Sequence, residues 1–358
     1  MVILSIDLGK YSSVCCWYTP GKEPVYDKIE TSPDSLKEAM LREKVDRVVI
    51  EVCHLAGWIA DLCQSLNLTL EVASTQDERW RWKRVKRKTD RIDALKLARL
   101  SFDGDLTLVH VPPKPVRQWR GLVIHRHRLV ERQTQIKNSI RALFESQGQR
   151  LPAGAAQWKS RTFRELLKSY AMPLDRCKAQ ALWKGQLHGE LVMLKTLVRQ
   201  TMKVEAKLDQ LAGADEQIAR LLSIPGIGLR TAEMVKVMLD DPKRFKHARQ
   251  VGSYSGLTPR QYESGLMKRN GKISKAGPAL LRKLLIQVAW GMLKNNPRGK
   301  ELFNRISKGH KTRRKLAAVA VGRHALIWCW GVLKNNQSWN WKADNKQEIR
   351  QDIKAMAG

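Results

Sequence analysis

The first hundred residues alternate between short apolar runs and amphipathic segments, a pattern typical of a mixed α/β sheet. Helical spacing of apolar positions at 35–43 and 57–66 predicts connecting helices, and a turn that contains Gly9 predicts a hairpin between the first two strands. The apolar runs that have the length and β-branched content of buried strands are 2–6, 14–18, 47–52 and 68–73.

Longer helices are predicted further along the chain. Residues 114–147 begin with prolines and continue as a basic helix, and residues 179–211 form a second one. Thr201 and Glu205 interrupt a heptad seam in the second helix, so pairing within one chain and pairing across a dimer both remain open. The seam consists of Leu187, Leu191, Leu194, Val198 and Leu208.

The pattern predicts a four-part chain. It divides into an α/β domain (1–112), a helical, coiled-coil-like linker for dimerisation (113–212), a mainly α domain (213–334) and a polar tail (335–358). The apolar stretch 316–333 contains Arg323 and His324, which favours a buried helix over a membrane span.

Charge is distributed unevenly along the 358 residues. Lys and Arg number 66 against 34 Asp and Glu, a net charge of +32. Residues 1–78 hold 7 basic and 13 acidic side chains, a net of −6, so the remaining 280 residues carry +38. Such a charge requires a polyanion nearby, and nucleic acid is the obvious candidate. Six cysteines without a C-x-x-C pair, and an acid already at Asp7, indicate a cytoplasmic protein with reduced thiols rather than a secreted one.

Four carboxylates are the candidate catalytic and metal-binding residues. Asp7 and Glu51 end two predicted strands, while Asp90 and Asp93 are one turn apart on a predicted helix. Four carboxylates brought together need a cation, and one or two Mg²⁺ ions would suit oxygen ligands and a phosphate substrate. The alternative is structural: strand-terminal acids in solvent, with Asp90 as an N-cap and Asp93 in the first helical turn.

The segment before Asp90 combines cations with tryptophan. This composition favours neutralisation of a nucleic-acid backbone together with stacking on exposed bases, although a solvated basic loop is the alternative. The candidate contacts are Arg79, Trp80, Arg81, Trp82, Lys83, Arg84, Lys86, Arg87 and Lys88.

A Pro-Gly-Ile-Gly turn at 225–228 has the form of a helix-hairpin-helix loop. Gly226 and Gly228 would let backbone N–H groups approach a phosphate at a helix N-terminus. A tight turn used only for packing is the alternative.

Ser264 lies in a strongly basic region. Residues 243–283 contain eleven Lys and Arg but one acid, Glu263. Cations that hold a scissile phosphate would assist a serine nucleophile, although no His/Asp pair completes a triad and Ser264 alone is typical of a turn. The cations expected around it are Arg260, Lys268, Arg269, Lys272 and Lys275.

These motifs together resemble the DEDD-type transposases of bacterial insertion sequences, the bridge-RNA-guided serine recombinases. The N-terminal matches are Ser5-Ile-Asp7, Val49-Ile-Glu51 and Lys88-Thr-Asp90-Arg-Ile-Asp93. The C-terminal matches are Ile224-Pro-Gly-Ile-Gly228, Gly256-Leu-Thr-Pro259, Ser264-Gly265 and Gly271-Lys-Ile-Ser-Lys275. The resemblance implies a RuvC-like, ribonuclease-H-type domain followed by a transposase domain.

The resemblance also implies an activity, partners and residue roles. The family's Asp, Glu, Asp, Asp set falls on Asp7, Glu51, Asp90 and Asp93, which would hold Mg²⁺, and its nucleophile falls on Ser264, which would form a covalent phosphoserine. The partners would be donor and target DNA, a structured guide RNA and further copies of the chain, from dimer to tetramer. The site of action would be the bacterial cytoplasm, at the nucleoid during the reaction.

Two other functions fit the residues. A metal-dependent nuclease or junction resolvase would use the carboxylates alone and form no covalent intermediate. A non-enzymatic basic nucleic-acid-binding protein would bind equally well without Mg²⁺.

Overall fold

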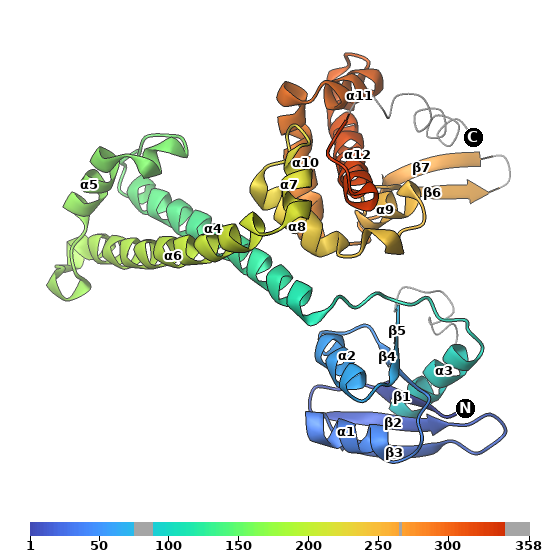
Figure 1. Cartoon of the computed structure of the whole chain (residues 1–358). Helices are drawn as coiled ribbons and strands as arrows, with labels where there is room; N and C mark the ends of the chain where they lie inside the picture. The colour runs from blue at the N-terminus through green and yellow to red at the C-terminus, as the bar shows by residue number, and fades with distance from the viewer. Residues whose placement is uncertain (75–88, 265–266, 341–358) are drawn as a thin grey trace. The chain divides into compact units, whose positions relative to one another are not determined.

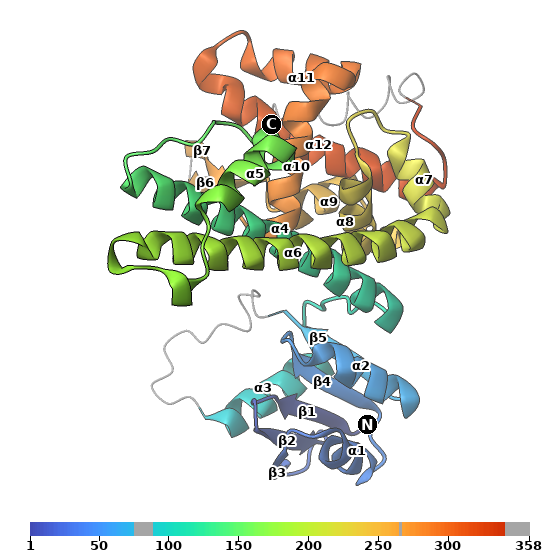
Figure 2. The ribbon, with the colours of Figure 1, turned by 90° about the vertical axis from the view of Figure 1, so that its left-hand side faces the viewer.

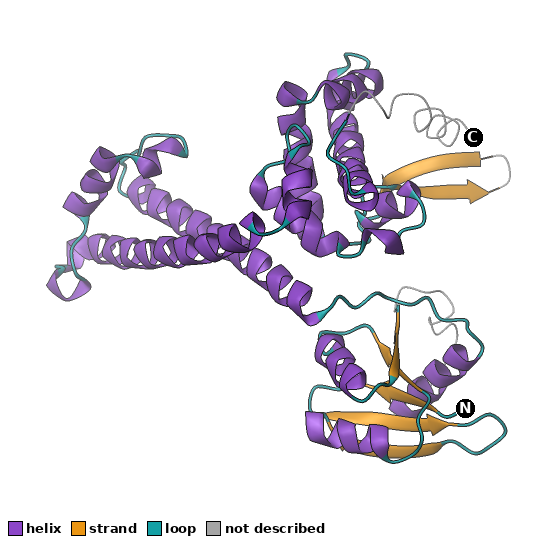
Figure 3. Cartoon of the chain, viewed as in Figure 1, coloured by secondary structure: helices purple, strands orange, loops and turns teal. Residues whose placement is uncertain are grey.

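The computed structural model describes residues 1–74, 89–264 and 267–340, which form two compact units, Met1–Arg117 and Gln118–Gly358 (Figure 1). The first contains a mixed sheet with helices, and the second is mostly helical (Figure 3). This overall α/β-then-α order agrees with the sequence prediction, whereas the finer division at residues 112, 212 and 334 stays a prediction.

The first unit is built on a five-stranded sheet of order β3-β2-β1-β4-β5. The first three strands are antiparallel, while β4 and β5 run parallel to β1, an order compatible with a ribonuclease-H-like domain. The sequence did not predict β3, because this edge strand is largely exposed and lacks an apolar run. The strands are β1 (Ile3–Asp7), β2 (Ser12–Tyr18), β3 (Val25–Glu30), β4 (Arg47–Glu51) and β5 (Thr69–Ala73).

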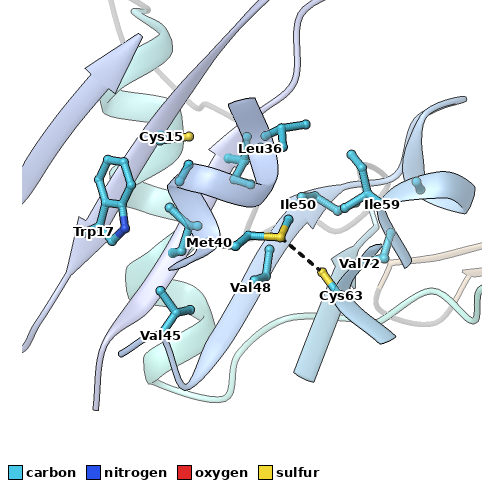
Figure 4. Packing of buried hydrophobic residues seen from close by; sticks show 14 residues of the cluster. Cys15, Trp17, Leu36, Met40, Val45, Val48, Ile50, Ile59, Cys63 and Val72 are labelled. Carbon is cyan, nitrogen blue, oxygen red and sulfur yellow. Dashed lines mark hydrogen bonds between the residues drawn. The ribbon is translucent and has the colours of Figure 1, made fainter. Parts of the chain in front are cut away.

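Helices cover both faces of this sheet. Helices α1 (Pro33–Leu41) and α2 (Ala56–Ser65) close the core that contains Leu4, Ile6, Val48 and Ile50 (Figure 4). Helix α3 (Asp90–Phe102) covers the other face, where Ile3 and Val49 meet Leu97. Because side chains alternate along a strand, the buried runs supply both cores.

Cysteine thiols belong to the first of these cores. The Cys63 Sγ lies 4.0 Å from the Met40 Sδ and so joins α2 to α1 (Figure 4). Burial raises the pKa of the Cys63 thiol to about 12, and all six cysteines of the chain are free thiols. The four buried ones, Cys15, Cys16, Cys63 and Cys329, act in the fold as small apolar groups.

The second unit begins one turn into α4 (Lys114–Ser146), and α4 lies beside a second long helix, α6 (Leu182–Gly213) (Figure 2). Gln133 Nε2 donates a hydrogen bond to Thr201 Oγ1 at 2.7 Å, and Arg126 pairs with Glu205. The two residues that interrupt the heptad seam therefore join the helices within one chain. Helix α5 (Arg161–Tyr170), which the sequence did not predict, contributes Phe163 to an aromatic cluster between them.

The remainder of the second unit surrounds helix α12 (Arg314–Asn335), which packs on α7, α9, α10 and α11. By length and composition the helical segment Lys311–Asn335 could cross a membrane, but 61% of its apolar window is buried inside the protein. Its apolar surface is explained by contact on all sides. The other elements are α7 (Glu216–Leu222), α8 (Leu229–Leu239), α9 (Ala248–Tyr254), β6 (Pro259–Ser264), β7 (Met267–Ile273), α10 (Ala279–Asn295) and α11 (Pro297–Ser307).

Short 3₁₀ turns and a C-terminal segment complete the second unit. The turns are η1 (Ala156–Lys159), η2 (Leu174–Arg176), η3 (Ala179–Ala181), η4 (Pro242–Arg244) and η5 (Lys311–Arg313). After α12 the chain returns to the α7–α8 connection, where the Trp339 backbone N–H donates to Ser223 Oγ at 2.7 Å. The Trp339 ring lies 5.4 Å from that of Trp328, so the start of the polar tail is anchored.

His324 predicts a pH-dependent stability. Burial, reinforced by Arg323, Arg298 and Arg305, lowers its pKa to about 3, against 6.5 in the unfolded chain. Because the unfolded state takes up the proton first, stability is fully present above about pH 6.5 and falls as the pH drops toward 3. We expect His324→Phe to weaken this dependence in urea unfolding at pH 7.5 and 4.5. The exposed His54→Gln is the control, and an unchanged dependence in His324→Phe would contradict the assignment.

Candidate functional site

Asp7 and Glu51 are neighbours at one edge of the sheet. Strands β1 and β4 are parallel and pair Ile6 with Ile50, so the residues that follow lie side by side at the carboxyl ends. Adjacent strands are about 4.8 Å apart, and both carboxylates are partly exposed. The sequence prediction that each acid terminates a strand is confirmed by the strand bounds.

Helix α3 brings a third carboxylate to this edge. Ser5 Oγ donates a 2.6 Å hydrogen bond to the carbonyl of Ala94, the residue after Asp93. Ser5 and Asp7 are two residues apart, so they point to the same face of the sheet, the face that α3 covers. Glu51 shares that face with Val49, which packs on α3. The α3 face of the sheet therefore presents Asp7 and Glu51 beside the helix that carries Asp93.

The two acids of α3 differ in burial. Thr89 Oγ1 accepts a hydrogen bond from the Ile92 N–H and caps the helix, so the interpretation of Asp90 as the N-cap is wrong. Asp90 is exposed in the first turn, where the helix dipole favours an acid. Asp93 is only 5% exposed. Helix-dipole stabilisation does not require burial of a carboxylate, which is costly, so Asp93 is the stronger candidate for a functional group.

The chemistry of this carboxylate set fits a divalent cation. Asp7, Glu51, Asp90 and Asp93 offer only oxygen ligands, the type that Mg²⁺ prefers. Among the described residues, however, no three His, Cys, Asp or Glu side chains converge closely enough to hold a metal ion. The fold thus brings the acids to the same face of the sheet at one edge, but their carboxylates are not close enough together to coordinate one ion.

The basic, tryptophan-containing stretch predicted to contact nucleic acid lies outside the described residues. All nine candidates from Arg79 to Lys88 fall within residues 75–88. Their role stays a prediction.

The region of Ser264 is a β-hairpin rather than an irregular loop. Ser264 is the last residue of β6 and pairs with Met267 at the start of β7, so it lies at the hairpin tip. The sequence did not predict this hairpin, because Gly265 and Gly271 favoured a loop assignment.

The hairpin register corrects the expectation that five cations surround Ser264. Lys268 and Arg269 pair with Glu263 and Tyr262 close to the tip. Arg260 and Lys272 belong to the opposite end of the hairpin, roughly 14 Å away at about 3.4 Å per residue. Lys275 follows β7 altogether.

The base of the hairpin is held tightly. The Lys275 N–H donates to the Gly256 carbonyl at 3.0 Å, and Lys275 itself adopts a left-handed conformation with φ 57°. Gly277 has φ 128°, and a Cβ there would collide with the Tyr254 carbonyl oxygen. The tip that carries Ser264 therefore extends from a rigid base.

The two glycines of the 225–228 turn have different surroundings. Gly226 has φ 94°, and a Cβ would come within 2.6 Å of Met292 Cγ on α10. Gly228 precedes α8 and is exposed, and a Cβ there would meet nothing within 4 Å. Close packing thus explains the glycine at 226. At 228 no packing contact requires a glycine, and the N-terminus of α8 is accessible to solvent there.

Sequence reasoning missed Ser5 and Thr89, which position the carboxylates. Ser5 tethers α3 to β1, and Thr89 fixes where α3 begins. The available signal for Ser5 was a single polar residue within an otherwise apolar strand. Thr89 directly before an acidic helical segment had the form of an N-cap.

Two family models match the chain. One, for DEDD transposases of the IS110 type, matches residues 4–147 and includes the whole carboxylate set. The other, described as the transposase IS116/IS110/IS902 family, matches residues 218–304 and includes the 225–228 turn and the hairpin. The fold and these matches define a DNA transposase, an enzyme that recombines DNA.

Relatives along the chain support the same conclusion. Over 343 residues it is 26% identical to the transposase for insertion sequence element IS1111A of Coxiella burnetii, covering 94% of this chain and 91% of the relative. It is 31% identical over 215 residues to a probable family 20 transposase of Pseudomonas aeruginosa, covering 59% and 62%. It is 28% identical over 125 residues to the pilin gene-inverting protein of Moraxella lacunata, covering 34% and 38%.

The chain belongs to the IS110/IS116 family of DEDD insertion-sequence transposases. Both matching families are described as transposases, so serine recombinase, the label attached to the resemblance above, is inaccurate as a family name. The DEDD domain suggests dependence on a divalent metal ion, and a transposase acts on DNA.

Gly226 and Gly228 form a matched pair for testing the turn. We expect Gly226→Ala to destabilise the protein by more than about 1 kcal/mol, because alanine is strained at positive φ and meets Met292. Gly228→Ala meets no clash, so it should cost less, only the difference between glycine and alanine at the N-cap of α8. If the turn binds phosphate, Gly228→Ala should weaken DNA binding in a gel-shift assay. Wild-type binding by this variant would favour a turn used only for packing.

Proposed function

We propose that this transposase is an RNA-guided recombinase that cleaves and exchanges DNA strands with a carboxylate site and a serine nucleophile. The proposal depends chiefly on one observation, the arrival of Asp7, Glu51 and the first turn of α3 at one face of the sheet edge. In this interpretation the first unit is a RuvC-like domain, and the α7–α8 connection is a helix-hairpin-helix.

The carboxylates would form the metal-binding half of the site. Asp7, Glu51, Asp90 and Asp93 would hold Mg²⁺, which neutralises charge that develops on a reacting phosphate. The nearly complete burial of Asp93 limits its rotamers, and Ser5 fixes the helix that carries it. These residues would orient the scissile phosphate and exclude part of its water.

Ser264 would supply the covalent half. Its hydroxyl oxygen would attack the scissile phosphorus, forming a serine–phosphate bond while the bond to one DNA oxygen breaks. The phosphodiester energy is retained, so the reverse attack by a DNA hydroxyl on another strand completes exchange. A hairpin tip on a rigid base suits this role, since the serine must reach a phosphate within a duplex.

The partners follow from the same proposal. Donor and target DNA would be selected by a structured guide RNA, and the chain would act as a homo-oligomer, from dimer to tetramer. The carboxylates and Ser264 belong to different compact units. The relative named as a pilin gene-inverting protein is consistent with strand exchange as the outcome.

We expect Asp7→Asn, Glu51→Gln and Asp93→Asn each to abolish recombination while leaving the protein folded. Each change removes one charged oxygen ligand at nearly constant volume. Mg²⁺ binding, measured by calorimetry without DNA, should weaken in the same variants. Asp34→Asn, an exposed acid on α1, is the matched control. Near-normal recombination by any two of the three would contradict the metal-site assignment.

Ser264→Ala should remove the covalent protein–DNA adduct and strand exchange, since the variant lacks the hydroxyl that would attack the phosphate. A denaturing gel of protein, Mg²⁺, RNA and labelled DNA measures the adduct. Two other serines lie close in the sequence, Ser255 and Ser274. Ser255 is fully buried, and its hydroxyl donates to the Gly252 carbonyl and accepts from the Leu257 N–H, so its loss would disturb the fold. Ser274→Ala is therefore the suitable control. DNA cleavage without any adduct in the wild type would favour a carboxylate-only nuclease.

A further inference from the structure

Many cations of the second unit are already paired with acids. Lys236 contacts Asp215 and Lys283 contacts Glu131, each at 2.8 Å. Arg230 bridges Asp209 and the buried Glu233. Such side chains stabilise the protein's own helices and are poorly available to a phosphate. The net charge of +32 therefore says little about where nucleic acid binds unless paired and unpaired cations are separated.

The connection between α11 and α12 carries unpaired cations. All eight residues from 308 to 315 are exposed, and five of them are Lys or Arg without any acid. Within the described part of the chain, none of these five side chains forms an ion pair. The cations of this basic connection are Lys308, Lys311, Arg313, Arg314 and Lys315.

Some of these cations lie at a helix N-terminus, where positive charge is unfavourable. Arg314 and Lys315 begin α12, where the helix dipole is positive, and the first turn contains no acid. The preceding Arg313 gives no side-chain cap. By contrast, α3 and α7 begin with capping side chains and acids in the first turn. Helix α12 tolerates this arrangement because the rest of its length is buried, and an anion from outside would relieve the repulsion.

We propose that the basic connection 308–315 is a binding surface for the phosphate backbone of duplex DNA. The inference rests on the proposed function only in that a transposase has DNA as its polyanionic partner. The segment contains no Trp, Tyr or Phe, and its one aromatic ring is His310. Five cations with no large ring favour contact with the phosphate backbone of a duplex over stacking of unpaired bases. Binding here is independent of DNA sequence.

A quadruple variant tests this surface, with the substitutions Lys311→Gln, Arg313→Gln, Arg314→Gln and Lys315→Gln. Lys308 is kept, because its left-handed conformation ends α11. Each lost phosphate contact makes the log–log dependence of DNA affinity on salt shallower by about 0.9, so we expect a change of roughly 2 to 4. Affinity at low salt should fall at least tenfold. The free variant should melt at the same temperature as the wild type or higher, since repulsion at the start of α12 is removed.

The control is a second quadruple variant with the same loss of charge on α6. Lys195, Arg199, Lys203 and Lys207 are exposed and spaced four apart, and all become Gln. A much smaller effect on duplex binding supports the proposal, whereas an equal effect would show that net charge rather than this surface governs affinity and would overturn it. An unchanged salt dependence in the 308–315 variant would also overturn it, as would a loss of binding confined to an RNA hairpin.

The DNA-binding result is separable from the chemistry. Asp7→Asn and Ser264→Ala are measured for recombination and the 308–315 variant for duplex binding, because neither Asp7 nor Ser264 belongs to the basic connection. If the first two variants recombine normally, the proposed chemistry fails while the assignment of the 308–315 surface stands. If instead the 308–315 variant binds DNA like the wild type, the surface assignment fails while the chemistry stands.

Discussion

The candidate site depends on how α3 docks on the sheet. The hydrogen bond from Ser5 Oγ to the Ala94 carbonyl ties the start of the helix to β1, and Arg47 of β4 donates to the Ser101 carbonyl near its end. Leu97 and Ala98 then fill the space above Ile3 and Val49, so the helix cannot shift without opening a cavity. Asp7 and Glu51 point to this same face only because their strands are parallel and in register. The positions of the carboxylates thus follow from how α3 packs on the sheet next to them.

The second unit uses rigid packing in a comparable way. The buried helix α12 supports its neighbours, and the close contact of Gly226 with Met292 fixes the turn before α8. Gly256 and Gly277 lock the base of the hairpin whose tip carries Ser264. In both units the candidate reactive groups lie at the ends of strands, while the residues behind them are closely packed. Rigid support is what accurate phosphoryl transfer requires of a scaffold.

Charge in this protein has two structural roles. Cations on α4, α8 and α10 pair with acids and join helices, as Arg126 does with Glu205. Others, such as those around Arg314, pair with no acid among the described residues and reduce the stability of the helix they begin. The cations of this protein therefore fall into two groups. Some form ion pairs within the fold, and others gain a partner of opposite charge only when a polyanion binds. The distinction explains how a protein of this charge folds at all.

Local patterns in the sequence determined much of this protein. The apolar runs fixed four strands and placed Asp7 and Glu51 at strand ends, and helical spacing fixed Lys114–Ser146. Only tertiary structure decided that Asp93 is buried, that Thr201 joins α6 to α4, and that Ser264 lies at a hairpin tip away from three of its five expected cations. The physical reason is that periodicity reports short-range geometry, whereas register, sheet face and burial depend on contacts between residues far apart in the chain.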